Sequence, residues 1–218
     1  MTSADPAGEG FRTFLVLRTG GPEASAAALD TLHTEVAHRI SRLDGFLSCR
    51  THLGLDGDVV VHTVGWRDEA SARGTYPATT LGEALLARLG RQVMLRTDLV
   101  GGAPGPGVRG PASAMPPGLA CVAIRYVADR AAGEAMADLL LRSGDWKKDF
   151  PGFVSATPYL GPDGTTYVNY PQWTDRAAFD AYMADPRNAA GQQDIADLEV
   201  APPDLLLCTL VAETVAAS

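Results

Sequence analysis

Two stretches decide the fold of this chain: GFLSCRTHLGLDGDVVVHTVGWRDEA at residues 45–70 and GFVSATPYLGPDGTTYVNYPQWTDRA at residues 152–177. An offset of 107 aligns them without a gap, and 11 of the 26 positions are identical. They share a Gly-Phe at the start, an Asp-Gly in the middle and a Trp-x-Asp near the end. The chain is therefore predicted to contain one small unit twice, as a built-in dimer.

Each stretch is predicted to form a hairpin, because Asp-Gly between strand-like segments is typical of a tight turn. In the first copy a strand over 11–18 and a helix from Pro22 precede the hairpin, and helices after Asp68 and a strand over 93–100 follow it. This β-α-β-β-α-β order is the ferredoxin-like plan, and the second copy repeats it from Leu119. The predicted class is α+β: two ferredoxin-like repeats whose antiparallel sheets pack, bare face to bare face, into an intramolecular dimeric α/β barrel.

The predicted domain order has four parts: a flexible tail over 1–10, an N-terminal repeat over 11–100, a linker over 101–118 and a C-terminal repeat over 119–215. The linker is expected because eleven of its eighteen residues are Gly or Pro. It contains a literal G-x-G-x-x-G, but its prolines prevent the helix that a dinucleotide site requires.

Composition argues against several classes of protein. A net charge of −8 and a pI near 4.9 oppose nucleic-acid binding, which needs a basic footprint. The three cysteines form no C-x-x-C pair and are interpreted as reduced thiols, and no metal site is recognisable. With no signal peptide and no long apolar run, we expect a cytoplasmic protein without a membrane partner, either a monomer with pseudo-twofold symmetry or a weak homodimer.

The second strand of each hairpin carries the candidate catalytic residues. His62 lies four residues before Trp66, and Asn169 lies four residues before Trp173, so the members of each pair share one face of their strand. A hydrogen-bonding side chain inside a sheet is costly unless it has a partner. Each polar residue is therefore either a satisfied core group or a pocket group, and both interpretations stay open.

Two arginines and a group of aromatic residues are candidate substrate-binding groups. Arg18 and Arg125 match at the offset of 107, near the end of each first strand. They are either solvated or placed to stabilise a phenolate or enolate. Aromatic side chains gather in the second copy, which favours it as the place for a flat aromatic ligand; the candidates are Trp146, Tyr159, Tyr167, Phe179 and Tyr182.

With Gly-Phe, Asp-Gly and Trp-x-Asp in both copies, the chain resembles the antibiotic-biosynthesis monooxygenase family of dimeric α/β-barrel proteins, in a tandem, single-chain form. The resemblance covers nearly the whole chain apart from the tail and the linker. The spacing of Asn169 and Trp173 is similar to the Asn-x-x-x-Trp of some of these oxygenases, while His62 takes the Asn position in the first copy.

The resemblance implies a monooxygenase without a cofactor, using molecular oxygen as co-substrate. Such an enzyme oxidises a polycyclic aromatic polyketide of the anthrone or hydroquinone type to a quinone: the deprotonated substrate passes an electron to O2, and the caged pair recombines. The alternatives are a non-oxidative polyketide cyclase and a non-catalytic ligand-binding barrel. Because Asn occurs only in the second copy, we expect the second pocket to be the active one.

Overall fold

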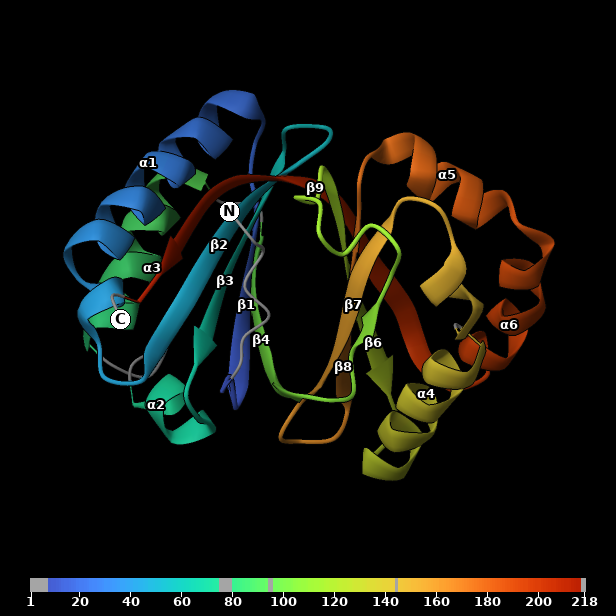
Figure 1. The fold of residues 1–218 in the computed structure, drawn as a ribbon. Helices are drawn as coiled ribbons and strands as arrows, with labels where there is room; N and C mark the ends of the chain where they lie inside the picture. The colour runs from blue at the N-terminus through green and yellow to red at the C-terminus, as the bar shows by residue number, and fades with distance from the viewer. Residues whose placement is uncertain (1–7, 75–79, 94–95, 144, 217–218) are drawn as a thin grey trace. The chain divides into compact units, whose positions relative to one another are not determined.

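The chain folds into two compact units (Figure 1). The N-terminal unit comprises Pro6–Gly101 with Cys208–Ser218, and the C-terminal unit comprises Gly102–Leu207. The last strand, β9 (Glu199–Val215), was predicted to belong wholly to the second repeat, but its second half belongs to the N-terminal unit because it pairs with β2. The computed structural model describes four stretches, residues 8–74, 80–93, 96–143 and 145–216.

The N-terminal unit is a sheet in the order β4-β1-β3-β2, with the second half of β9 beside β2. β1 and β2 both pair antiparallel with β3, and in Figure 1 α1 and α3 lie on one side of these strands. Leucines of α1 and α3 enter one core with Leu15 and Val60 of the sheet. The strands are β1 (Phe11–Arg18), β2 (Phe46–Gly54), β3 (Val59–Trp66) and β4 (Arg96–Pro104), and the helices are α1 (Pro22–His38), α2 (Glu69–Arg73) and α3 (Thr80–Val93).

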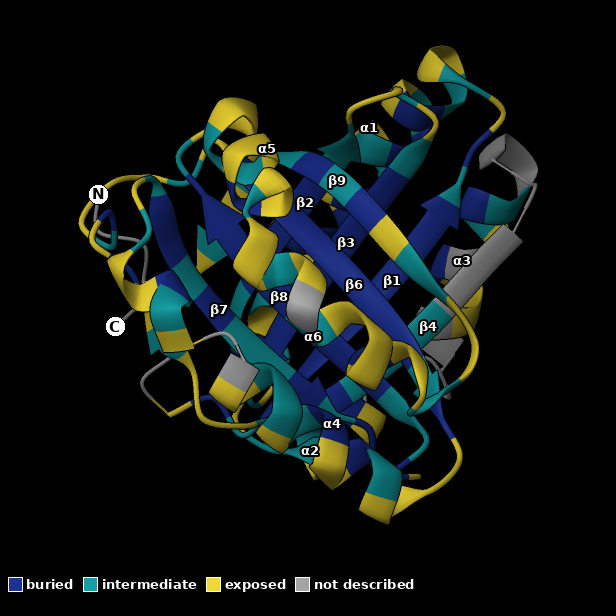
Figure 2. Cartoon of the chain, turned by 90° about the vertical axis from the view of Figure 1, so that its right-hand side faces the viewer, coloured by how far each residue is buried: buried dark blue, intermediate teal, exposed yellow. Residues whose placement is uncertain are grey.

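The C-terminal unit is a sheet in the order β9-β6-β8-β7-β5. β6 and β7 pair antiparallel with β8, and α4, α5 and α6 lie on one side of these strands in Figure 1. Figure 2 shows β6 as buried, while α5 and α6 carry exposed residues on their outer side. The strands are β5 (Val108–Arg109), β6 (Leu119–Val127), β7 (Phe153–Leu160) and β8 (Thr166–Trp173), and the helices are α4 (Arg130–Ser143), α5 (Arg176–Ala184) and α6 (Pro186–Ala196).

The shared motifs have local structural reasons. Gly45 and Gly152 have φ angles of +79° and +78°, a left-handed conformation that favours glycine. In each Trp-x-Asp the tryptophan ends a strand and the aspartate caps the next helix. Asp68 accepts a hydrogen bond from the Ser71 backbone N–H at 2.7 Å, and Asp175 caps α5 in the same way. The α+β class and the two ferredoxin-like repeats are thus confirmed.

Two predicted irregular segments contain ordered structure. β4 was predicted over 93–100 but runs from Arg96 to Pro104, and β5 pairs with β7, so the Gly/Pro-rich segment 101–118 is not simply a linker. A Cβ on Gly101 would lie 2.7 Å from the Phe11 ring, which explains a glycine in this strand. The end of the predicted tail is also packed, since Glu9 is buried in an ion pair with Arg12.

The strand register corrects one match between the repeats. Phe11 pairs with Trp66, whereas Leu119 pairs with Trp173, so the first strands correspond at an offset of 108 although the hairpins correspond at 107. The second copy has one residue fewer between its first strand and its hairpin. Arg125 therefore takes the place of Leu17, and the predicted equivalence of Arg18 and Arg125 is wrong.

No helix within the described stretches is both long enough and apolar enough to cross a bilayer. These stretches also contain no group of three or more His, Cys, Asp or Glu residues arranged to hold a metal ion.

Candidate active site

A cavity of about 320 Å³ lies in the C-terminal unit, between the sheet and its helices. Alternate residues of β6 and β8 form its floor, since side chains on one face of a strand recur every two residues. Its volume is in the range typical of small-molecule sites. The floor consists of Cys121, Ala123, Arg125, Asn169, Pro171 and Trp173, and α5 and α6 cover it with Phe179, Tyr182, Met183, Arg187, Asn188, Gly191, Gln192 and Ile195.

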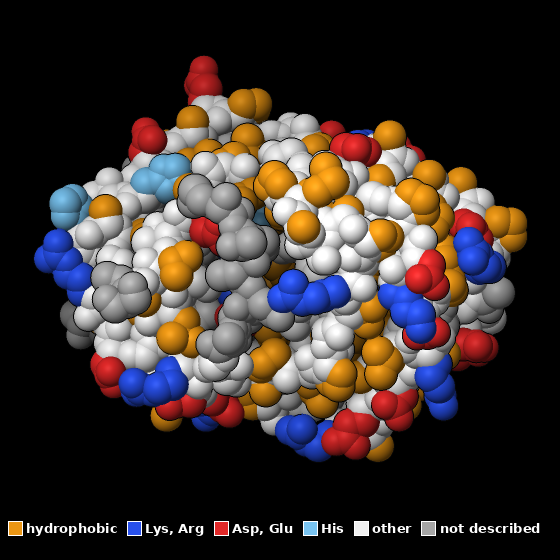
Figure 3. All heavy atoms as spheres, viewed as in Figure 1, with side chains coloured by type: hydrophobic (Ala, Val, Ile, Leu, Met, Phe, Trp, Pro, Cys, Tyr) orange, Lys and Arg blue, Asp and Glu red, His pale blue; other side chains and the backbone are white. Residues whose placement is uncertain are grey.

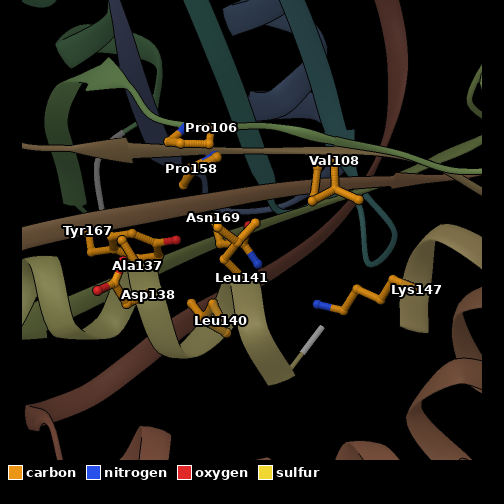
Figure 4. Close-up of a pocket in the computed structure, with 11 residues that line it drawn as sticks. Pro106, Val108, Ala137, Asp138, Leu140, Leu141, Lys147, Pro158, Tyr167 and Asn169 are labelled. Atoms are coloured by element: carbon orange, nitrogen blue, oxygen red, sulfur yellow. The ribbon is translucent and has the colours of Figure 1, made fainter. Parts of the chain in front are cut away.

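A second cavity of about 70 Å³ adjoins the first, and the two share Leu140, Lys147 and Asn169 as lining residues. Pro106 and Val108 from the Gly/Pro-rich segment line the smaller cavity (Figure 4). In Figure 4 the amine end of Lys147 points toward the region where Asn169 and Leu140 lie. Lys147 and Asn169 thus stand at the junction of the two cavities.

Most of the predicted second-copy residues meet at these cavities. Asn169, Trp173 and Arg125 line the larger one together with Phe179 and Tyr182. The tyrosine ring lies 4.8 Å from the tryptophan ring, centroid to centroid. Of the aromatic residues that the sequence predicts as substrate contacts, Phe179 and Tyr182 thus lie with Trp173 at the larger cavity.

Three predicted substrate-binding residues do not line the larger cavity. Tyr167 lines only the smaller cavity, and Trp146 stacks behind Tyr182 with ring centroids 5.0 Å apart instead of lining either cavity. Tyr159 is buried but faces away, because it pairs with Val168 on the opposite face of the sheet from Asn169. Its prediction as a substrate contact is wrong for the two cavities described here.

Trp173 and Trp66 differ in their hydrogen bonding. The Trp66 indole N–H donates to Thr13 Oγ1 at 3.2 Å. In the second copy the register places Cys121 where Thr13 stands, and the buried Trp173 N–H has no acceptor among the described residues. A buried donor without an acceptor is unusual, and here it belongs to a residue that lines the cavity.

The first copy fills the corresponding space with side chains. Leu15 and Leu17 stand where the second copy has Ala123 and Arg125, and both leucines are fully buried in the core of the N-terminal unit. His62 lies opposite Leu15 with its Nδ1 2.9 Å from Thr51 Oγ1. Burial, with a smaller effect of His33, lowers the pKa of His62 to about 4, so its imidazole is neutral.

The structure thus places His62 and Trp66 in a packed core. The prediction that they act on a substrate is wrong, because apolar side chains already occupy the face they share. Arg18 lies half-buried at the end of β1 in the same unit and is not among the residues that line the two cavities.

Positive charge gathers at the larger cavity although the chain carries a net charge of −8. Arg125, Lys147 and Arg187 line it, and none of the lining residues is an aspartate or glutamate. Outside the cavity, Figure 3 shows basic and acidic side chains interspersed on the visible face among the residues described. Two of these cations have acidic partners outside the lining, Arg187 with Asp185 at 2.8 Å and Arg125 with Glu199, so the positive charge left without an ion pair among the described residues is that of Lys147.

Arg125 is fixed by one acidic partner. It is 9% exposed, and its Nη1 donates to the Glu199 carboxylate. Its Nε is buried and has no acceptor among the described residues. Like the Trp173 N–H, this unpaired donor belongs to a residue that lines the larger cavity.

Lys147 was missed by the sequence interpretation. It comes from a short 3-10 turn, Asp145–Asp149, and is 9% exposed. Burial, followed by the charge of Arg125, lowers its pKa to about 8. Two lysines are adjacent in this turn, and nothing in the sequence shows that Lys147 turns inward while Lys148 pairs with Asp145 on the surface.

No family model matches the chain. Tetracenomycin-F1 monooxygenase from Streptomyces glaucescens is 54% identical over 43 residues, which are 20% of this chain and 38% of that protein. The chain therefore spans well under half the length of this curated relative.

Solved structures are similar over nearly the whole chain. An anthrone oxidase-like protein superposes with a TM-score of 0.83 at 15% identity, covering 99% of this chain and 97% of its own. An uncharacterized ferredoxin fold protein related to antibiotic biosynthesis monooxygenases, from Listeria monocytogenes, superposes with a TM-score of 0.56 at 7% identity, covering 96% and 99%. The resemblance indicated by the motifs is confirmed at the level of the fold.

Proposed function

We propose that the C-terminal unit is a monooxygenase that oxidises a polycyclic aromatic polyketide of the anthrone or hydroquinone type to a quinone, without a cofactor. The observation that carries the proposal is the larger cavity itself, with its aromatic side, its three cations and its unpaired N–H donors. The names of the relative and of the structural neighbour, a monooxygenase and an anthrone oxidase-like protein, support the same class of reaction.

The proposed reaction begins with loss of a proton from the substrate, which gives an electron-rich phenolate or enolate. This anion passes one electron to O2, and the resulting radical and superoxide combine to form a C–O bond. Proton transfer and loss of one water then give the quinone. For an anthrone the balance is substrate plus O2 to quinone plus water, so no external reductant is needed.

The cavity residues have separate roles in this scheme. Arg125 and the Trp173 N–H stabilise the oxygen on which negative charge develops, because donors fixed in a buried site act strongly on such charge. Asn169 donates from its amide to the same oxygen or to reduced oxygen at the junction of the two cavities. Phe179 and Tyr182 hold the flat ring system.

The test is O2 consumption by the purified protein, stripped of metal and flavin, with an anthrone as substrate. Asn169→Ala and Trp173→Phe should each lower kcat by about 100-fold, the size expected for losing one donor to a developing oxyanion. Trp66→Phe is the matched control in the first copy and should leave the rate unchanged in the folded protein. Absence of O2 uptake across anthrones by correctly folded protein would refute the proposal, and product formation without oxygen would favour the cyclase.

A further inference from the structure

Lys147 is a buried cation without a counter-ion. No described carboxylate forms an ion pair with it, and its described contact is the Tyr182 ring, whose centroid lies 5.1 Å from Nζ. Its neighbour Lys148 is half-exposed and bonds Asp145 at 2.9 Å. Burial of an unpaired ammonium is unfavourable. A contribution to folding stability therefore does not explain the presence of a lysine at this position.

The groups that face Lys147 reinforce this feature. The Arg125 charge on β6 disfavours a second positive charge, and the Glu199 carboxylate that would offset it is bonded to Arg125. The remaining titratable groups that line the two cavities are Cys121 on β6, Asp138 on α4, Tyr167 on β8, Tyr182 on α5 and Arg187 on α6. Among them only Asp138 is a carboxylate, and it lines the smaller cavity without an ion pair to Lys147.

Apart from Asp138 in the smaller cavity, the other residues that line the cavities are poor proton acceptors at neutral pH. Burial raises the pKa of Cys121 to about 11 and raises the pKa values of Tyr167 and Tyr182 above their ordinary range, so all three stay protonated. Arginine does not lose its proton in proteins, and the Asn169 amide is not basic. Lys147, with a pKa of about 8, is present in part as the neutral amine.

We propose that the Lys147 amine removes the proton from a phenolic hydroxyl of the aromatic substrate, and that Arg125 holds the oxyanion that results. The substrate O–H bond breaks, an N–H bond forms on Nζ, and the electron pair stays on oxygen as phenolate. No electron leaves the substrate in this step. The inference rests on the proposed function, since electron transfer to O2 requires this anion.

The geometry favours this division of roles. Lys147 reaches the junction of the two cavities from one side, and Arg125 reaches the larger cavity from the sheet. After proton transfer the Lys147 ammonium stands beside the phenolate, so the new negative charge is balanced where it forms. The step also converts a buried unpaired amine into a paired one.

A binding experiment tests the proposal separately from oxygenase activity. The probe is 4-nitrophenol, whose visible absorbance reports its ionisation, mixed with excess protein at a pH where the free probe is mostly neutral. We expect the wild type to bind it as phenolate and Lys147→Met to bind it as neutral phenol. Lys148→Met, adjacent in the chain but paired on the surface, should behave as the wild type. Equal ionisation of the probe in the wild type and Lys147→Met, or no binding by the wild type, would overturn the inference.

Turnover gives the second measurement. The substrate here is a hydroxyanthrone, which carries a phenolic hydroxyl. In the wild type its kcat/KM should rise with pH through about 8, the pKa of Lys147, and in Lys147→Met this rise should be lost with a decrease in kcat of about 100-fold or more. A substrate already ionised at the assay pH should lose much less. Equal losses for both substrates would refute proton removal by Lys147, whereas phenolate binding without any O2 uptake would refute the oxygenase and leave the anion site standing.

Discussion

Ala123→Leu tests whether the larger cavity is open because the side chain at position 123 is small. Ala123 stands on β6 opposite Asn169, at the position that Leu15 occupies in the first copy opposite His62. The substitution adds three carbon atoms beside a cavity of about 320 Å³. At about 0.8 kcal/mol per buried methylene group, the free energy of unfolding should rise by up to about 2 kcal/mol. Turnover of an aromatic substrate should fall sharply, because the leucine occupies its place.

Urea unfolding followed by tryptophan fluorescence measures the first effect, and O2 uptake measures the second. The matched change is Leu15→Ala, which empties a packed core and should cost about 2 to 5 kcal/mol of unfolding free energy. A loss of more than about 1 kcal/mol in Ala123→Leu would mean that the site is already filled. Unchanged turnover would mean that the substrate binds elsewhere. Either result would refute the assignment of the cavity.

Three further predictions concern stability. Lys147→Met should raise the free energy of unfolding at pH 7 by up to about 3 kcal/mol, because folding lowers the pKa of Lys147 from 10.5 to about 8, at a cost of about 1.36 kcal/mol per pH unit. Between pH 8 and 10.5 the folded wild type binds fewer protons than the unfolded chain, so the wild type gains stability as the pH rises. The difference in unfolding free energy between Lys147→Met and the wild type, measured by urea unfolding, should therefore shrink over this range. Thr13→Val should cost about 1 to 3 kcal/mol in the same assay, because it leaves the Trp66 N–H unpaired, and no loss would argue against that bond. Glu9→Ala should cost about 3 to 5 kcal/mol by removing the carboxylate that pairs with the buried Arg12, and a thermal melt unchanged from wild type would contradict the buried pair.

The features that the sequence predicts correctly are those that depend on neighbouring residues. A glycine with positive φ, an Asp-Gly turn and an aspartate that caps the next helix each act over a few positions, so their repetition defines the two units. Asn169 and Trp173 could be placed on one face by alternation along a single strand. Both residues line the larger cavity, whereas the same face of the first copy is packed with apolar side chains.

The errors arise where a register changes. Tyr159 was predicted because aromatic residues gather in the second copy. Its strand face could not be derived by counting by twos from Phe153, because an irregularity between Phe153 and Ser155 inverts the alternation, so that Pro158 faces the cavity instead. The equivalence of Arg18 and Arg125 failed because one residue is missing between strand and hairpin, and a fixed offset cannot detect this. In both cases the local residue types are ordinary, and only the paired strands reveal the shift.

Lys147 could not be predicted from the sequence for a different reason: whether a side chain in a short turn is buried depends on the elements that pack over it. The same holds for the unpaired donors: the Trp173 N–H is orphaned only because Cys121 replaces a threonine across the strands. Each buried donor without an acceptor costs folding free energy. A ligand oxyanion would supply the acceptor that the Trp173 N–H and Arg125 Nε lack, so ligand binding would recover part of that free energy. By mass action, a ligand present at 100 times its Kd would stabilise the folded protein by about 2.7 kcal/mol. The buried donors that lack an acceptor in the second repeat are thus the groups to which an anionic aromatic ligand would hydrogen-bond.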